Sequence, residues 1–193
     1  MAILFVKIRF CAKIINMSTI LNIDQIVYQQ MFLLQHAWLT PVMIFITDIV
    51  GSVSLPIFVA VLIFYFWRQK QKAKIYLVIF GLGGGLIIEM ALKMIIGRVR
   101  PPVELVTEIT YSFPSGHATM AAIFFAILIY CFKDKIKNLF WRRLYIFANI
   151  FLCLLIGFTR LYLGVHWLSD VVAGLAIGMI WFFIVEKLTR NKK

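Results

Sequence analysis

Five long apolar stretches dominate the chain, and each is close to the length that a helix needs to cross a bilayer. A transmembrane helix takes about 20 predominantly apolar residues. With 63% hydrophobic residues and a mean hydropathy of +0.94, the chain is more apolar than a water-soluble domain of its length, which indicates a membrane environment. The fourth stretch is short, so it must extend past Arg160 or begin near Trp141. The sequence therefore predicts an all-α, polytopic membrane helical bundle with five spans, at residues 41–67, 75–96, 115–132, 144–159 and 166–185.

No extended soluble domain fits between these stretches. We therefore expect one membrane-embedded domain over 1–193, with the core spans in 41–186 and N-terminal or interfacial helices in 1–40.

The N-terminal region leaves the number of spans open. Residues 1–21 are apolar, but they contain Lys7, Arg9 and Lys13, which are costly inside a membrane span. They form either a poor sixth span or a helix in the membrane interface. The segment 22–40, NIDQIVYQQMFLLQHAWLT, has the pattern of an amphipathic helix on the outer face.

Positive charge is gathered in short blocks and not spread along the chain. The formal net charge of +12 would suggest nucleic-acid binding if it were evenly distributed. Instead, the blocks follow alternate spans, which is typical of juxtamembrane anchors on the cytoplasmic side. The loops 97–114 and 160–165 must then face outward. We expect no nucleic-acid partner, and the basic blocks are RQKQKAK (68–74), KDKIK (133–137), WRR (141–143) and TRNKK (189–193).

Metal and cofactor signatures are missing from the sequence. Cys11, Cys131 and Cys153 lack the spacing of a zinc site or a disulfide framework. No carboxylate cluster has the arrangement that magnesium prefers. We expect no metal and no cofactor. We also expect no removable signal peptide, because no cleavage pattern follows a clean apolar core near the start.

Several polar residues lie at the predicted outward ends of the spans, where charge is expensive, at about 2.5–3.5 kcal/mol each. His166 and Asp170 are four residues apart, so on a helix they share one face. A carboxylate one turn from a histidine can accept its ring N–H and make the other ring nitrogen more nucleophilic. Arg160 lies just upstream, across a turn that contains Gly164.

A second polar group opens the third span. Ser115 is placed to cap a helix, and Gly116 lets an anion approach the free backbone N–H groups of the first turn. His117 lies in that turn, while Lys93 and Arg100 bracket the exit of the preceding span. Cations, a helix N-terminus and two histidines, one of them backed by a carboxylate, are what phosphoryl transfer needs. In this scheme the cations take the place of a metal.

Three motifs carry a family resemblance. KMIIGRVRP (93–101), PSGH (114–117) and TRLYLGVHWLSD (159–170) resemble the signatures of the type 2 phosphatidic acid phosphatase superfamily. That family's pattern is K-x6-R-P, then P-S-G-H, then S-R-x5-H-x3-D. The single departure is Thr159 in place of serine, and because a hydroxyl remains we expect little consequence.

The resemblance implies a role for each matching residue. His166 would attack phosphorus to form a phosphohistidine, Asp170 would support it, and His117 would protonate the leaving oxygen. The phosphate would be held by Lys93, Arg100, Ser115, Gly116 and Arg160. Other acids are interpreted differently: Glu89 as an ion-pair partner of Lys93, one helical turn away, and Glu104 and Glu108 as solvated loop charges.

The resulting hypothesis is a metal-independent lipid phosphatase of the cell membrane with an outward-facing site, whose partners are a lipid substrate and the bilayer. Undecaprenyl diphosphate and phosphatidylglycerol phosphate are favoured because the chain is minimal and its site faces outward, while phosphatidate and lipid A phosphates stay open. A lipid phosphotransferase would use the same residues. A non-catalytic lipid or ion carrier would distribute its polar residues across the membrane depth, which this chain does not do. The oligomeric state is left open.

Overall fold

The computed structural model describes the backbone of residues 2–190 and the side chains of residues 18–190. Helices and their connections account for all of the described backbone, and no strand occurs in it, which confirms the all-α prediction. The α-helices are α1 (Ala2–Leu33), α2 (Leu39–Thr47), α3 (Ser54–Arg68), α4 (Lys72–Ile96), α5 (Gly116–Phe132), α6 (Leu139–Tyr162) and α7 (Leu168–Arg190), with short 3-10 turns at Asp48–Val50 and Lys133–Lys135.

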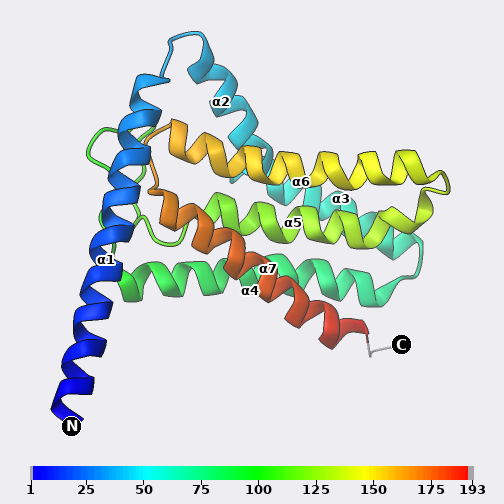
Figure 1. Ribbon diagram of the computed structural model, residues 1–193. Coiled ribbons are helices and arrows are strands. Elements are labelled where there is room, and N and C mark those ends of the chain that lie inside the picture. The colour runs from blue at the N-terminus through cyan, green and yellow to red at the C-terminus, as the bar shows by residue number, and fades with distance from the viewer. Residues whose placement is uncertain (1, 191–193) are drawn as a thin grey trace.

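The five predicted spans are confirmed. Among the described residues, five segments are long and apolar enough to cross a membrane: Leu39–Arg68, Lys72–Ile96, Gly116–Lys135, Leu139–Tyr162 and Leu168–Arg190. The fourth span extends at both ends, to Leu139 and to Tyr162. In Figure 1, α4, α5 and α6 run alongside one another and α7 crosses them obliquely.

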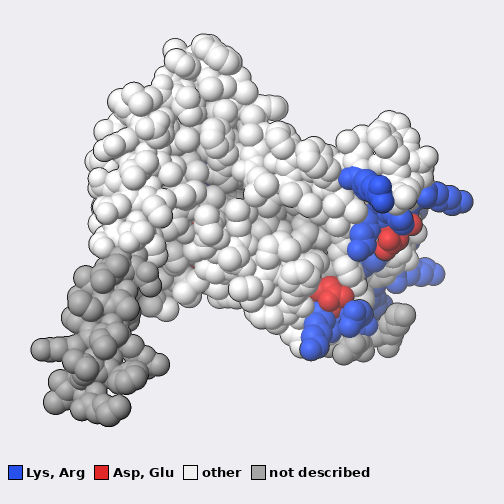
Figure 2. Space-filling view, viewed as in Figure 1, with Lys and Arg blue, Asp and Glu red and all other residues white. Residues whose placement is uncertain are grey.

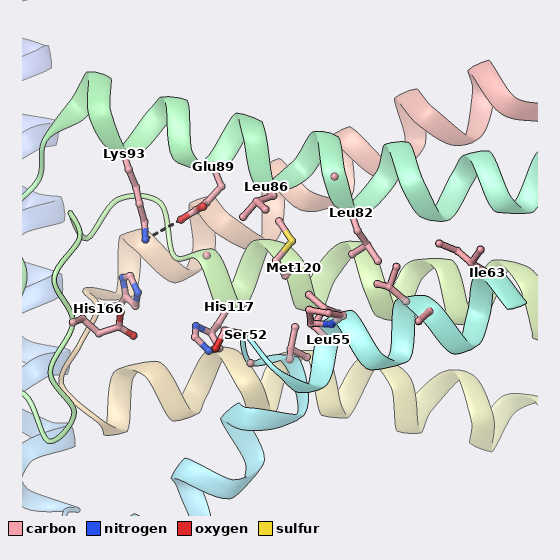
Figure 3. Close-up of a pocket in the computed structure, with 18 of the residues that line it drawn as sticks. Ser52, Leu55, Ile63, Leu82, Leu86, Glu89, Lys93, His117, Met120 and His166 are labelled. Carbon is pink, nitrogen blue, oxygen red and sulfur yellow. Dashed lines mark ion pairs between the residues drawn. The ribbon is translucent and has the colours of Figure 1, made fainter.

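The first span is not one continuous helix, contrary to the prediction for 41–67. It divides into α2 and α3, with a 3-10 turn and a short link between them. The Asp48 carbonyl accepts the Gly51 N–H at 3.1 Å and also accepts the Ser54 hydroxyl, so the chain turns and then starts a new helix. Figure 1 shows α2 leaving the bundle direction that α3 follows. The break brings Ser52 close to His117 at the start of α5, as Figure 3 shows.

Helix α5 forms the centre of the bundle and packs against α4, α6 and α7. Every residue from 118 to 127 is buried. A helix that is apolar on all sides is stable only inside a core or a bilayer. Its neighbours contribute buried side chains such as Phe66 from α3 and Leu77 from α4. The helix whose first turn carries His117 is therefore held from all sides.

Helix α1 lies across the bundle and does not run along it. Figure 1 shows α1 roughly perpendicular to α4, α5 and α6, at the end where α4 stops and α5 starts, and it packs on α6 and α7. In its described part Ile20, Leu21 and Ile26 are about half exposed or more, whereas Asp24 is buried. This direction fits the interfacial alternative, and α1 is not among the five candidate spans of the described residues. The helix ends at Leu33, earlier than the predicted 40, and the side chains of Lys7, Arg9 and Lys13 lie outside the described residues.

The basic residues of the loops from α3 to α4 and from α5 to α6 gather at the opposite end of the bundle from α1. Figure 2 shows Lys and Arg clustered where α3 passes to α4 and α5 to α6. The predicted polar residues of the outward loops lie at the α1 end. The two ends of the bundle therefore differ in charge as the sequence predicted.

Candidate active site

Polar side chains from three chain segments meet at the α1 end of the bundle: the exit of α4, the start of α5 and the link from α6 to α7. All of the site residues predicted from the sequence lie here: Lys93, Arg100, Ser115, Gly116, His117, Arg160, His166 and Asp170. Figure 3 shows His166, His117 and Lys93 facing one cavity. Residues up to 77 positions apart in sequence are thus brought into one site.

The start of α5 is tied to the other elements. Ser115 caps the helix, its Oγ accepting the Ala118 N–H at 3.5 Å, while its own N–H donates to the Asp170 carbonyl at 3.1 Å. At Gly116 a Cβ would lie 2.8 Å from Glu89 Oε1, so a larger residue would displace the Glu89 side chain, which is paired with Lys93. The first turn of α5 therefore lines the cavity with Gly116 and His117.

The link between α6 and α7 turns sharply to place His166. Gly164 has φ +70°, and a Cβ there would lie 2.5 Å from the Val103 carbonyl oxygen. The connection between α4 and α5 holds this turn, because the Leu105 N–H donates to the Leu163 carbonyl at 2.9 Å. A left-handed turn at glycine therefore aims His166 back into the bundle.

His166 lies in the link just before α7 and faces Asp170 in the first turn of that helix, so the predicted contact is present, but the two residues do not share a helix, because α7 begins at Leu168. His166 Nδ1 lies 3.5 Å from Asp170 Oδ2, and both side chains are buried. That separation is long for a hydrogen bond, and Nδ1 has no closer partner among the described residues. Catalytic hydrogen bonds are often long without substrate and shorten when it binds. The second ring nitrogen, Nε2, is directed towards Arg100 Nη1 at 3.3 Å.

Burial shapes the ionisation of the two loop residues in the site. It lowers the pKa of His166 to about 4, which the neighbouring Asp170 carboxylate opposes and the charges of Arg100 and Arg160 reinforce. Burial also lowers the pKa of Arg100, against the charge of Glu108. The His166 imidazole is consequently neutral near pH 7, with a lone pair available on Nε2.

The three cations are fixed by neighbours from different elements. Arg100 donates to the Thr110 and Val165 carbonyls, both at 2.7 Å. Lys93 pairs with Glu89 at 2.8 Å, which confirms the predicted ion pair. Arg160 is 2% exposed and its Nη1 lies 3.3 Å from Thr47 Oγ1.

Glu108 is not a solvated loop charge, so that prediction is wrong. It forms an ion pair with Arg160, and its second oxygen lies 3.7 Å from Arg100 Nη2. Glu104 is also engaged, because its Oε1 accepts the Glu108 N–H at 3.3 Å. The loop folds back over the end of the bundle, and Glu108 neutralises two of the cations that would hold an anion.

We expect Glu108→Gln to strengthen binding of the phosphate mimic vanadate by about tenfold, or ~1.4 kcal/mol. The reason is that an anion would no longer compete with a carboxylate for Arg160 and Arg100. The measurement is the vanadate inhibition constant. Glu104→Gln is the matched control, because Glu104 accepts a hydrogen bond from the Glu108 N–H and forms no ion pair among the described residues. Vanadate affinity that is unchanged or weaker would show that Glu108 orients the arginines and does not compete with the anion.

The hydroxyl of Thr159 does not point to the cations. Its Oγ1 donates to the Ile156 carbonyl at 2.7 Å within α6. The family's serine at this position is thus replaced by a residue whose hydroxyl is satisfied by its own helix.

Two residues that contact the site were given no role in it from the sequence, although Arg98 is one of the charged residues at the outward ends of the predicted spans. Arg98 lies inside the first motif at a variable position, and it bonds both Asp170 and Asp24. Asp24 lies 74 residues away in α1. An isolated carboxylate in an amphipathic helix carries no local signal of such a contact.

A cavity of about 660 Å³ leads away from these polar groups. Its polar end is lined by Lys93, Arg100, His117 and His166 among others. Its remaining wall is apolar and comes from α3 and α4, with Leu55, Val59, Ile63, Leu82 and Leu86 (Figure 3). The arrangement suits a molecule with one anionic end and one apolar end.

Comparison with known proteins shows which family this chain resembles in sequence and in fold. The model of the PAP2 superfamily matches residues 73–193. A curated protein of Bacillus subtilis, phosphatidylglycerophosphatase B, is 31% identical over 98% of this chain and 97% of its own length. The crystal structure of a transmembrane PAP2-type phosphatidylglycerolphosphate phosphatase from Bacillus subtilis matches with a TM-score of 0.80 and 28% identity, covering 98% of this chain and 96% of that one. The putative undecaprenyl-diphosphatase YbjG of Escherichia coli is 30% identical over 74% of this chain and 70% of its own length.

Proposed function

Because the chain belongs to the PAP2 superfamily, we propose that it removes the terminal phosphate of phosphatidylglycerol phosphate. It is a membrane lipid phosphatase, and our proposal concerns the identity of its lipid substrate. The relative named for this substrate aligns over nearly the whole of both chains. The observation that carries the proposal is the cavity, which has cations and two histidines at one end and an apolar wall along α3 and α4.

In the proposed first step, His166 Nε2 attacks phosphorus and the bond to the lipid oxygen breaks. His117, on the start of α5, gives a proton to that oxygen. The lipid oxygen then leaves as the hydroxyl group of phosphatidylglycerol and not as an alkoxide, and the phosphoryl group remains on His166. Asp170 stabilises the positive charge that develops on the ring through Nδ1.

In the second step, water attacks the phosphohistidine and frees inorganic phosphate. His117, having lost its proton, accepts one from that water, which restores both histidines. In both steps the equatorial oxygens of the phosphoryl group would be held by the cations Lys93, Arg100 and Arg160. The start of α5, at Ser115 and Gly116, would contribute to the same binding site. Because protein cations supply this charge, the proposal needs no metal.

Undecaprenyl diphosphate is the second candidate substrate. It is favoured by the Escherichia coli relative whose name carries that activity. The same cavity would hold its terminal phosphate and the start of its apolar chain. The two lipids differ in the group next to the phosphate, so they are separated by assay.

The test is phosphate release by the purified protein in detergent, with phosphatidylglycerol phosphate, undecaprenyl diphosphate, phosphatidate and lipid A as substrates, with and without EDTA. We expect the highest kcat/KM for phosphatidylglycerol phosphate and no loss of activity in EDTA. A higher value for undecaprenyl diphosphate would overturn the substrate assignment. Activity lost on chelation and restored by magnesium would overturn the role of the cations. Phosphate passed to an added acceptor lipid in place of water would make the protein a phosphotransferase.

The site is also proposed to face the exoplasmic side of the cell membrane. Support comes from the basic residues at the opposite end of the bundle (Figure 2), which the positive-inside rule assigns to the cytoplasm. We expect Ile109→Cys, at a residue 97% exposed, to react with a membrane-impermeant thiol reagent in intact cells. Gln69→Cys at the basic end should react only after lysis. Both variants are made in a chain whose native cysteines are replaced, and the reverse labelling pattern would invert the topology.

A further inference from the structure

A buried charge network connects the interfacial helix α1 to the carboxylate behind His166. We propose that Asp24 and Arg98 are positioning residues that hold Asp170 in place for catalysis, so that α1 is part of the catalytic apparatus. This inference rests on the proposed function of His166 and Asp170. It adds two residues that lie outside the defining positions of the three motifs.

Arg98 sits between two carboxylates. Its Nη1 donates to Asp170 Oδ1 at 2.5 Å and to Ser169 Oγ at 2.7 Å, and its Nη2 donates to Asp24 Oδ2 at 2.7 Å. The guanidinium also lies 5.6 Å from the ring centroid of Trp167. A planar group bonded on two edges and packed against a ring has little freedom to move.

Asp24 is committed to this network. It is 2% exposed, although it belongs to a helix whose neighbouring residues are largely exposed. Its Oδ1 accepts the Ser169 N–H at 2.8 Å, and its Oδ2 accepts the Ser169 hydroxyl at 2.6 Å in addition to Arg98. A buried carboxylate is tolerated only when it is paired and hydrogen-bonded in this way.

The network orients Asp170 through both of its oxygens. Arg98 bonds Oδ1, and the Trp167 N–H donates to Oδ2 at 2.9 Å. The carboxylate is completely buried, and the remaining direction of Oδ2 is the one that faces His166 Nδ1. Losing the Arg98 bond would free the carboxylate to rotate away from the histidine.

Asp24 also has an electrostatic effect on the site. With Asp170 as its only acidic partner, Arg98 would cancel the charge that His166 needs when its ring becomes positive. Two carboxylates around one guanidinium leave the Asp24–Arg98–Asp170 group with one net negative charge on the Nδ1 side of His166, whereas Arg100 faces Nε2. Asp24 therefore allows Arg98 to position Asp170 without neutralising it.

The first test compares Asp24→Asn and Arg98→Lys with the wild-type chain and with Tyr28→Phe. Partners one layer behind a reacting group typically contribute about 10–100-fold. We expect Asp24→Asn to lower kcat for phosphatidylglycerol phosphate by that factor and to change KM less than about threefold, because Asp24 touches none of the phosphate cations. Arg98→Lys should retain part of the activity that Arg98→Gln loses.

Tyr28→Phe is the matched control for anchoring of α1. The Tyr28 hydroxyl bonds the Val103 N–H and carbonyl at 3.1 and 3.2 Å, so it ties the same helix to the same end of the bundle without touching Arg98 or Asp170. We expect its kcat to stay within about threefold of wild type. If Tyr28→Phe and Asp24→Asn lose kcat equally, Asp24 only anchors the helix and the inference is wrong.

A double-mutant cycle tests whether Asp24 acts through Asp170. In an Asp170→Asn background, Asp24→Asn should reduce kcat by less than about threefold, because the effect it transmits is already lost. If Asp24→Asn lowers kcat by the same factor in the Asp170→Asn background as in the wild-type chain, the inference is overturned.

A second readout does not depend on lipid turnover. Diethyl pyrocarbonate reacts with neutral imidazole, and the reaction at each of the three histidines can be followed by peptide mass spectrometry. Asp24→Asn should slow modification of His166 about tenfold, with His117 and His36 unchanged as internal references. Equal rates at His166 in both proteins would overturn the network. If Asp24→Asn slows the modification of His166 but the wild-type protein hydrolyses no lipid phosphate, the network is supported and only the proposed function is refuted.

Discussion

Replacing His166 by alanine should abolish hydrolysis of every phosphate ester, by about 10⁴-fold or more, as loss of the nucleophile does in other covalent hydrolases. The expectation follows from a ring that is buried, neutral near pH 7 and directed with Nε2 towards the cations. Wild-type protein quenched during turnover should carry labelled phosphate that is labile to acid and stable to base, and His166→Ala should carry none.

His36→Ala is the control for this experiment. Residue 36 lies in the connection between α1 and α2, is exposed, and bonds Tyr162 through its backbone N–H and carbonyl. Its loss should leave the phosphoenzyme intact. Labelled phosphate on the His166→Ala protein would end the assignment of the nucleophile.

The pH dependence of the wild-type enzyme gives a further check on His166. Because burial lowers the pKa of its ring to about 4, the free enzyme keeps the reactive neutral form down to that pH. The acid limb that His166 contributes to kcat/KM should therefore lie well below the ordinary histidine value of about 6.5. If the acid limb of kcat/KM lies near pH 6.5 and comes from His166, the ring is in a more solvated site than this structure shows.

His117→Ala should separate substrates by their leaving group. If His117 is the general acid, its loss should slow cleavage of the lipid ester by about 10²–10⁴-fold, because a lipid alkoxide is a poor leaving group without a proton. With p-nitrophenyl phosphate the departing phenolate needs little protonation, so the first step should change much less. The measurement is the burst of p-nitrophenol and not the steady-state rate, because His117 also serves the second step.

His166→Ala provides the comparison, since the nucleophile is needed whatever group leaves. It should remove the burst and the lipid activity together. Equal losses of burst and lipid cleavage in His117→Ala would mean that His117 binds phosphate and that another group is the acid.

The amino-acid sequence determined the fold class and the motif-borne part of the site. A membrane span is decided by the composition of about 20 consecutive residues, so hydropathy alone located all five. A spacing of four predicted the contact between Glu89 and Lys93, which share a turn of α4. It also predicted the contact between His166 and Asp170, although His166 lies just before α7 and not on the helix. Ser115 was recognisable as a cap for the same reason, because its partner Ala118 is three residues away.

The tertiary structure alone decided which charges pair over long distances. Glu108 contacts Arg160 across 52 residues, and Arg98 contacts Asp170 across 72 and Asp24 across 74. A charge on a loop has the same local sequence whether it lies in solvent or between two arginines, and so Glu108 was interpreted wrongly. The break at Asp48 to Gly51 is similar, since the apolar composition of the span continues through it while the hydrogen bonds do not. Local composition and helical periodicity depend on residues that are close in sequence, so they can be read from the sequence. The partner of a buried charge depends on which distant segments the packing of the helices brings into contact.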